Sequence, residues 1–285
     1  GQIVLPIEER ANIQATVATA GQENVAEDKL GILEPLRANL VLVQAGASYM
    51  TGLIGNVSIP VYSGSNVGWA GEVAAATDGA GKFSEVNLEP KRLTAYIDVS
   101  KQFLIQDSNS AEEMLKRDIV AAISNKLEAT ILGNAAGSAT QPAGLLNGVT
   151  ADTAAVTYAD FVNMEATLGE KNVRGDIKFI VSPSAKAVLK STAKNQNSFI
   201  MEGNEVNGYP VLCTSAVAGK GIVYGNFSDL VIGQWGGIDL TVDPYTQAAN
   251  GKVRLVINAY FDAKPRRADS FVKNCLLYTS PSPRD

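Results

Sequence analysis

The sequence predicts an α+β fold, in which a long helix and a set of mostly antiparallel strands occupy different parts of the chain. The helix is indicated by apolar residues at steps of four between residues 115 and 131, after a Ser-x-x-Glu capping box. Strands are indicated by the alternating segment 93–100 and by short apolar segments that follow residue 209. Helices and strands segregated in this way are typical of α+β proteins.

The composition is that of a globular chain with little catalytic chemistry. The 285 residues are 46% hydrophobic and 19% charged, and the formal net charge is −5. There is no histidine, which excludes Ser-His-Asp and Cys-His nucleophilic sites and histidine-ligated metals. The two cysteines, Cys213 and Cys275, are too few for a disulfide scaffold or a thiolate cluster. We therefore expect no cofactor and no metal, and we expect Cys213 to be a buried thiol.

The chain also lacks the signals of membrane and nucleic-acid binding. No apolar stretch reaches the roughly 18 residues of a membrane span, and no positively charged leader precedes a hydrophobic segment. Residues 265–267 form only a small basic cluster, and an acidic chain without a basic face does not bind DNA by counterion release. The sequence begins at Gly1 and not at methionine, so we expect that upstream residues are missing from it.

The first sixty residues predict an arm, a short helix and a strand. Residues 1–30 are mixed and weakly patterned, which indicates an extended N-terminal arm. Residues 33–44 predict a short helix that tolerates Pro35 in its first turn. Residues 56–60 alternate like a strand that stops at its proline.

Residues 63–90 are rich in glycine and small residues and differ from the rest of the chain. Weak strand patterns at 67–73 and 83–88 flank the tip 77–81, so we predict a long hairpin with a glycine-rich tip. Such a segment cannot build a core of its own, and its length is typical of functional loops. Trp69 would be exposed in a monomer, and exposed tryptophans usually anchor interfaces. The inference is that the chain associates with copies of itself.

The second half of the chain predicts helices first and strands later. A helix is expected at 111–132, followed by a loop at 133–148. Trp235 lies in an apolar strand and is expected in the core. The other expected elements are a capped helix at 157–168, a strand at 176–181, a helix at 183–191 with proline at its first position, a polar exposed loop at 194–208, and strands at 210–214, 221–224, 230–233, 238–242 and 252–261.

Two sequence features suggest a ligand-binding or catalytic site. The tip sequence GAGK resembles a phosphate-binding loop, but the Walker pattern requires Ser or Thr where Phe83 stands. The carboxylate pairs Glu112 with Glu113 and Asp239 with Asp243 suggest a histidine-free hydrolase. The first pair is explained equally well by its place in the first turn of a helix, where carboxylates favour the helix dipole. A hydrolase therefore stays as an alternative of another class.

The last eleven residues, CLLYTSPSPRD at 275–285, do not continue the pattern of the chain. They match the in-frame translation of a sequencing-library transposon adapter. We therefore interpret them as an artefact and exclude them from the expected fold. The alternative is a natural flexible tail.

Several segments in a fixed order carry a resemblance to a known family. The chain resembles the major capsid proteins of tailed phages, which have the Hong Kong 97-like fold. No single segment is diagnostic, but the ordered set is fairly specific and covers residues 30–274. The resembling segments are GLIGNVSIPVYSG (52–64), GWAGE (68–72), VNLEPKRLTAYIDVSKQFLIQD (86–107), QPAGLL (141–146), IVSPSAKAVL (180–189), NGYPVLCT (207–214), YGNFSDLVIG (224–233) and FDAKPRRADSFVK (261–273).

The resemblance implies a division of the chain and a function. It implies a non-enzymatic coat subunit that forms the hexamers and pentamers of an icosahedral shell around double-stranded DNA, in a virion capsid assembled in the host cytoplasm. Portal, scaffold or protease, and decoration proteins are further implied partners, and DNA is enclosed without sequence-specific binding. The implied parts are an N-terminal arm (1–30), a peripheral domain (31–62, 91–149 with a spine helix, and 245–274), an extended loop (63–90) and an axial domain (150–244).

The resemblance also places contacts and leaves alternatives open. It implies that the extended loop crosses a neighbouring subunit, so we expect Trp69, Glu72, Lys82 and Phe83 to contact that neighbour. Some family members join a loop lysine to a neighbour's asparagine through an isopeptide bond, for which Lys82 is the candidate lysine, although nothing local identifies the asparagine. An encapsulin-like compartment, which shares the fold and holds protein cargo, is the nearest alternative.

Overall fold

The computed structural model describes residues 40–65, 67–73, 75–76, 78–102, 108–147, 151–152 and 156–275. The expected N-terminal arm (1–30) and all but the first residue of the presumed adapter segment (275–285) lie outside the described residues. Among the described helices, none is long and apolar enough to cross a membrane. The elements combine helices with two main sheets, which confirms the expected α+β class.

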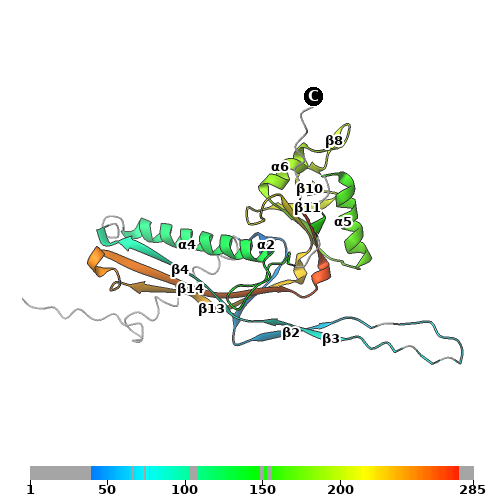
Figure 1. Ribbon diagram of the computed structural model, residues 1–285, viewed down its shortest axis with the longest axis horizontal. Coiled ribbons are helices and arrows are strands. Elements are labelled where there is room, and N and C mark those ends of the chain that lie inside the picture. Colours follow the sequence, from blue (N-terminus) through cyan, green and yellow to red (C-terminus); the bar gives the residue numbers. More distant parts are fainter. Residues whose placement is uncertain are drawn as a thin grey trace, which may run out of the picture.

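A four-stranded sheet with a long helix along it forms one part of the molecule (Figure 1). Its elements are β1 (Ser48–Leu53), β13 (Leu230–Asp243), β14 (Lys252–Pro265), β4 (Lys91–Ser100) and the helix α4 (Ser108–Ile131). β1 runs parallel to β13, whereas β13, β14 and β4 are antiparallel to one another in turn. This sheet therefore combines two strands from the first 100 residues with two strands that follow residue 229.

α4 is an amphipathic helix whose apolar side faces the sheet. Ile119, Ile123 and Leu127 are buried in the same cluster as Ile257 and Phe261 of β14. The step of four that predicted this helix is therefore the spacing of its core-facing side chains. The helix starts at Ser108 and not at 111, so the serine expected as its cap lies inside it.

A seven-stranded sheet with two helices forms the other main part, at the upper right of Figure 1. Its strands, in spatial order, are β5 (Ala151–Asp152), β15 (Phe271–Cys275), β12 (Gly221–Asn226), β6 (Ile177–Val181), β11 (Tyr209–Cys213), β10 (Glu205–Val206) and β9 (Met201–Glu202), and its helices are α5 (Tyr158–Glu170) and α6 (Pro183–Ser191). Phe161, Phe179, Leu189 and Tyr224 fill the core between sheet and helices. The Phe179 and Tyr224 rings are stacked with centroids 4.2 Å apart.

Both helices of this part begin where local sequence signals place them. The Asp160 carboxylate accepts hydrogen bonds from the Thr157 backbone N–H at 2.8 Å and from its hydroxyl at 2.9 Å, which confirms the second capping box. The Ser182 hydroxyl accepts from the Ala185 N–H at 3.1 Å, and Pro183 occupies the first helical position. The starts of α5 and α6 are therefore specified by a few residues each.

The segment that precedes β1 connects the two parts. The short helix α2 (Val41–Gln44) is the described portion of the helix expected at 33–44. Leu40, Leu42 and Ala45 are buried in a cluster that also contains α4 residues and Val223 of the seven-stranded sheet. This segment therefore fills the junction between the two sheets.

The chain between α6 and β11 differs from the expected exposed loop at 194–208. It forms β7 (Ala193–Asn195), β8 (Ser198–Phe199), β9 and β10, and Ile200, Met201 and Val206 are buried. β10 pairs with β11, which is a contact that local polarity does not reveal. Long-range pairing therefore outweighed the polar composition of this segment.

Two of the strands expected after residue 209 are continuous in the structure. The two strands expected at 230–233 and 238–242 are one strand, β13, with an irregularity between Trp235 and Asp239 where Gly236 takes a φ of 62°. β13 pairs in the four-stranded sheet, whereas β15 from near the chain end joins the seven-stranded sheet.

Cys213 ends β11 and is exposed, so its expected burial is wrong. Three 3₁₀ turns are η1 (Phe227–Asp229), η2 (Ala248–Asn250) and η3 (Ala268–Ser270).

Candidate subunit interface

A two-stranded hairpin projects from the body of the subunit (Figure 1). β2 (Val57–Tyr62) and β3 (Phe83–Leu88) are antiparallel, with Val57 opposite Leu88 and Tyr62 opposite Phe83. The expected hairpin is present, but its first strand is β2 and not residues 67–73. β2 also continues past Pro60, which a two-stranded ribbon permits because each strand has one unpaired edge. The following residues 63–65 and 67–73 carry no strand.

The root of the hairpin is packed into the body. Leu88 is buried against Val231 and Trp235 of β13, with further apolar side chains of β1 and β2 around them. The Trp235 indole N–H donates to the Gly55 carbonyl oxygen at 2.5 Å. Trp235 is only 6% exposed, which confirms its expected place in the core. The turn between β1 and β2 is thereby fixed to the centre of the sheet.

A buried carboxylate holds the other side of the root. Asp262 of β14 is 0% exposed and accepts hydrogen bonds from the backbone N–H groups of Glu89 and Ala263, each at 3.0 Å. It also forms an ion pair with the Lys91 ammonium at 3.2 Å. The Lys264 ammonium donates to the Asn87 carbonyl oxygen at 2.5 Å. The chain leaving β3 is thus held on both sides of its turn, and this fixes the direction in which the hairpin projects.

The paired part of the hairpin ends in a small polar and aromatic cluster. The rings of Tyr62 and Phe83 are 4.8 Å apart, and Ser63 exchanges backbone and side-chain hydrogen bonds with Lys82 at 3.0 and 2.8 Å. The Tyr62 hydroxyl accepts from the Gly81 N–H at 3.1 Å. A Cβ atom on Gly81 would lie 2.2 Å from the Gly64 carbonyl oxygen, so only glycine fits this position.

The four residues expected at a subunit contact lie on this hairpin and are exposed. Trp69 is completely exposed and Phe83 is 78% exposed, while Glu72 and Lys82 are also exposed. Phe83 and Lys82 lie at the end of the paired strands, and Trp69 and Glu72 lie beyond it. The structure places all four on one projection.

Further apolar side chains on the same projection were missed by the sequence reasoning. Val67 and Val73 are 90% and 98% exposed, and Ile54, in the β1–β2 turn at the root, is 92% exposed. The valines were assigned to a strand, although their neighbours Gly68 and Gly71 are a signal against one. The hairpin therefore presents more apolar surface than the two aromatic residues alone, and such surface marks interaction sites in soluble proteins.

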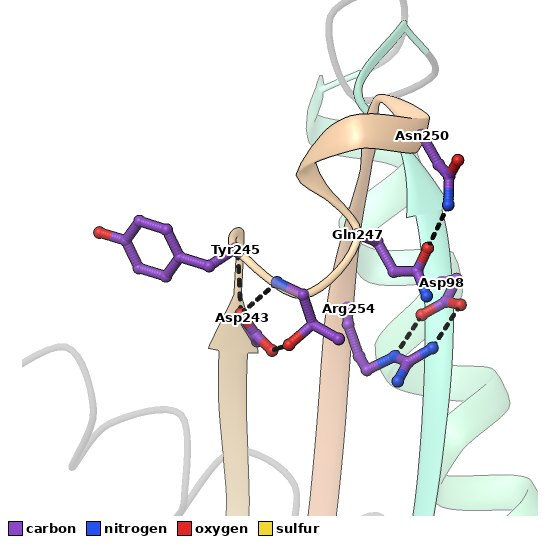
Figure 2. A network of polar contacts seen from close by, with 7 residues as sticks. Asp98, Asp243, Tyr245, Gln247, Asn250 and Arg254 are labelled. Carbon is purple, nitrogen blue, oxygen red and sulfur yellow. Dashed lines mark hydrogen bonds and ion pairs between the residues drawn. The ribbon is translucent and has the colours of Figure 1, made fainter.

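A second exposed surface lies at the other end of the four-stranded sheet. The Arg254 guanidinium binds both Asp98 carboxylate oxygens, at 2.7 and 2.9 Å (Figure 2). It also stacks on the Tyr96 ring with 4.3 Å to its centroid. This bidentate contact lowers the pKa of Asp98 and raises that of Arg254. The pair joins β4 to β14 and leaves most of the Tyr96 ring in solvent.

The turn between β13 and β14 is held open by local hydrogen bonds, also seen in Figure 2. Asp243 accepts from the backbone N–H groups of Tyr245 and Thr246, at 2.8 and 3.1 Å, and from the Thr246 hydroxyl. These bonds lower the pKa of Asp243, with the Thr246 hydroxyl as the largest cause. Tyr245 points away from the turn and is 84% exposed. The described residues thus expose aromatic side chains on the hairpin and at the far end of the four-stranded sheet.

The phosphate-loop hypothesis and the Asp239–Asp243 pair gain no support from the described residues, and the side chains of Glu112 and Glu113 lie outside them. Asp243 of one carboxylate pair is engaged in its turn, and the GAGK segment leads into β3 and not into a helix. Nowhere in the described residues do three His, Cys, Asp or Glu side chains gather at a metal site. A groove of about 820 Å³ beside the hairpin root contains Glu85 and Asp269, which bind Ser58 and Lys171. The candidate site in the described residues is therefore the exposed surface of the hairpin.

Comparison with known proteins agrees with this reading. The family model described as the phage capsid family matches residues 28–274. The chain is 28% identical over 250 residues to the major capsid protein of Halomonas phage phiHAP-1, and this covers 84% of the chain and 41% of that relative. It is 28% identical over 199 residues to the capsid polyprotein of Pseudomonas phage PAJU2, covering 63% of the chain and 30% of that relative. The chain thus spans less than half the length of either relative.

Solved structures show the same fold at low sequence identity. The capsid of a native GTA particle superposes with a TM-score of 0.69 at 16% identity, covering 83% of this chain and 90% of the other. A structure from Gordonia phage Cozz gives a TM-score of 0.67 at 14% identity, covering 84% and 86% of the two chains. Since the family model covers most of the sequence and the fold agrees, the chain belongs to the phage capsid family.

Proposed function

We propose that this chain is the structural coat subunit of a tailed phage or prophage, and that it assembles with copies of itself. The observation that carries the proposal is the hairpin, whose root is packed into the body while Trp69, Val67 and Val73 in its distal part are almost fully exposed. An ordered projection of this kind loses conformational entropy without gaining burial. A neighbouring copy that covers it supplies the missing burial.

The proposed assembly is an icosahedral shell of hexamers and pentamers around double-stranded DNA. The four-stranded sheet with α4 acts as the peripheral domain, α4 as its spine helix, and the seven-stranded sheet as the axial domain at the centre of each hexamer or pentamer. The family and the shared fold support this assignment. The net charge of −5 suits a wall that encloses DNA without binding it. We place the subunit in the virion capsid, assembled in the host cytoplasm.

The distal hairpin needs a receiving surface, and the face of the four-stranded sheet opposite α4 suits it. Ile97 and Ile257 point towards α4, so their neighbours along β4 and β14 point the other way. Tyr96 and Tyr260 on that opposite face are both exposed. We expect Trp69 and Phe83 of one copy to cover aromatic side chains of this face in the next copy. Aromatic side chains are enriched in protein interfaces.

Other partners follow from the family alone. Portal, scaffold or protease, and decoration proteins are expected to contact the shell. The relatives with which the chain aligns are much longer than the matched segment, and one of them is named a capsid polyprotein. We therefore expect the capsid segment to function together with sequence that these relatives carry elsewhere.

Two other functions remain as competitors with distinct outcomes. An encapsulin-like compartment would share the fold and hold protein, so nuclease-protected DNA in purified particles supports the phage shell and its absence supports the compartment. A histidine-free hydrolase would be a soluble enzyme. The engagement of Asp243 in its turn argues against a free catalytic pair of Asp239 and Asp243.

Expression of the chain, size-exclusion chromatography and negative-stain imaging test the proposal. We expect a peak of megadalton size that contains closed shells or isolated hexamers and pentamers. A peak of single-subunit size under conditions that support assembly of related shells would contradict it.

A further inference from the structure

A buried glutamate lies where the two sheets of the subunit meet. Glu128, near the end of α4, is 3% exposed. Its carboxylate accepts a hydrogen bond from the Leu42 backbone N–H at 3.2 Å and one from the Thr214 hydroxyl at 3.1 Å. The Val41 backbone N–H is a further donor to it. One side chain therefore joins α4, the α2 segment and the end of β11.

These three segments are far apart in sequence and belong to different parts of the fold. α4 covers the four-stranded sheet, Thr214 directly follows a strand of the seven-stranded sheet, and α2 lies in the apolar cluster between them. At the other end of α2, the Lys178 ammonium donates to the Ala45 carbonyl oxygen at 3.3 Å. The junction of the sheets is thus held by contacts that include a single buried carboxylate.

The described residues around Glu128 supply hydrogen bonds but no cation. The segment 40–47 contains no titratable side chain. The titratable groups of β11 are Tyr209, whose hydroxyl donates to Glu165 at 3.2 Å, and Cys213, which is exposed. Lys178, at the far end of α2, is already paired with Asp176 at 2.7 Å. Burial raises the pKa of Glu128 above its ordinary value of 4.5, and the hydrogen bonds from Leu42, Thr214 and Val41 only partly oppose this.

We propose that Glu128 is a titratable joint between the two sheets, which is weaker when the carboxylate is ionised and firmer when it is protonated. An ionised carboxylate without a cation is costly in an apolar junction. A protonated one keeps an acceptor oxygen for the α2 N–H groups, and its O–H can donate to the Thr214 hydroxyl, so that the hydrogen bond between these two side chains is kept with its direction reversed. This property belongs to the single subunit and does not depend on the proposed shell.

The sign of the pH dependence follows from the direction of the shift. Because the folded subunit holds the proton to a higher pH than the unfolded chain, this group favours folding most at a pH below 4.5. Its contribution falls as the pH rises from 4.5 through the folded pKa, and the full penalty is present above that value. Mild acid therefore tightens the junction, and neutral pH loosens it.

Thermal unfolding of the full chain between pH 4 and pH 8 tests the proposal. Glu128→Gln imitates the protonated form, so we expect it to raise the melting temperature at pH 8 by roughly 2–4 °C and to converge with the unmodified chain at acid pH. Asp118→Asn is the matched control, because it removes one negative charge from an exposed position of the same helix. It should leave the pH profile unchanged. A lower melting temperature for Glu128→Gln at pH 8, or an unchanged difference at all pH values, would overturn the proposal.

Amide hydrogen exchange of the unmodified chain gives a second readout that needs no variant. After correction for the intrinsic effect of pH on exchange, the Val41 and Leu42 amides should be better protected at mildly acid pH than at neutral pH. Amides in β14, remote from Glu128, serve as the internal reference. Equal or opposite changes in the two regions would count against the joint.

Discussion

The root and the distal part of the hairpin belong to one continuous stretch of chain, but apolar side chains are buried at the root and exposed in the distal part. At the root, Leu88 and Trp235 are buried and Asp262 binds three donors. In the distal part, Trp69 and Phe83 are exposed, although their side chains are as apolar as those of Trp235 and Leu88 at the root. The difference teaches that the subunit fixes the direction of the projection and leaves its contact surface for another molecule.

Removal of the Asp262 carboxylate should have the largest effect on the root. Asp262→Ala leaves Lys91 and two backbone N–H groups without their acceptor, so we expect a loss of about 3–5 kcal/mol in the free energy of unfolding. Chemical denaturation measures it. Glu89→Ala is the control, because only the backbone of Glu89 takes part, and it should be close to neutral. Similar losses in both variants would show that the carboxylate does not hold the root.

A cavity at the root should cost somewhat less. Leu88→Ala removes a fully buried side chain, and we expect a loss of about 3 kcal/mol in the free energy of unfolding. Phe83→Ala, on the exposed end of the same strand, should change that free energy by less than about 0.5 kcal/mol. If Phe83→Ala destabilised the isolated subunit as much as Leu88→Ala, the proposed contrast between root and distal part would be wrong.

Substitution of Trp69 should separate folding from assembly. Trp69→Ala removes an exposed side chain, so the free energy of unfolding should change by less than about 0.5 kcal/mol while the yield of assembled particles falls. Glu72→Ala, also in the distal part, tests whether the contact is apolar and should reduce assembly less. Particle yield is measured by sedimentation. Normal assembly of Trp69→Ala would remove this side chain from the proposed interface.

The Asp98–Arg254 pair at the far end of the sheet should have the smallest effect. Because Arg254 lowers the pKa of Asp98, the pair stabilises the fold at neutral pH, and that contribution is lost as the pH falls below about 3.8. Thermal unfolding should therefore show a slight loss for Asp98→Asn at pH 7 that becomes smaller as the pH falls below about 3.8. The exposure of the pair keeps the loss small. A loss that grows on acidification would contradict the assignment.

Local signals predicted the elements they control. The step-of-four pattern of α4, the Thr157–Asp160 capping box and the Ser182-Pro183 start of α6 are each contained in a few neighbouring residues, and all three are confirmed as helices. The exposure of the projecting segment was also predictable, since glycine and alanine cannot form a core. These inferences need no knowledge of distant parts of the chain.

Contacts between segments that are distant in the chain could not be predicted from local sequence patterns. Local patterns do not show that β13 is one strand across Gly236, or that residues 201–206 add two strands beside β11. The polar partners Asp262 and Glu128 were missed for the same reason, because each binds groups more than eighty residues away. The sequence around a buried carboxylate does not distinguish it from an exposed one, because its hydrogen-bond donors come from distant segments.

The most direct test of the central claim compares the full chain with a variant whose residues 65–81 are replaced by a two-residue turn. The paired strands with Lys82 and Phe83 and the root stay in this variant, so it removes the distal part of the proposed contact surface, with Trp69 and Glu72. Analytical ultracentrifugation with parallel thermal unfolding gives both readouts. We predict an unchanged melting temperature for the isolated subunit and the loss of particles of megadalton size. Particles of normal size and yield from the shortened chain would contradict the account.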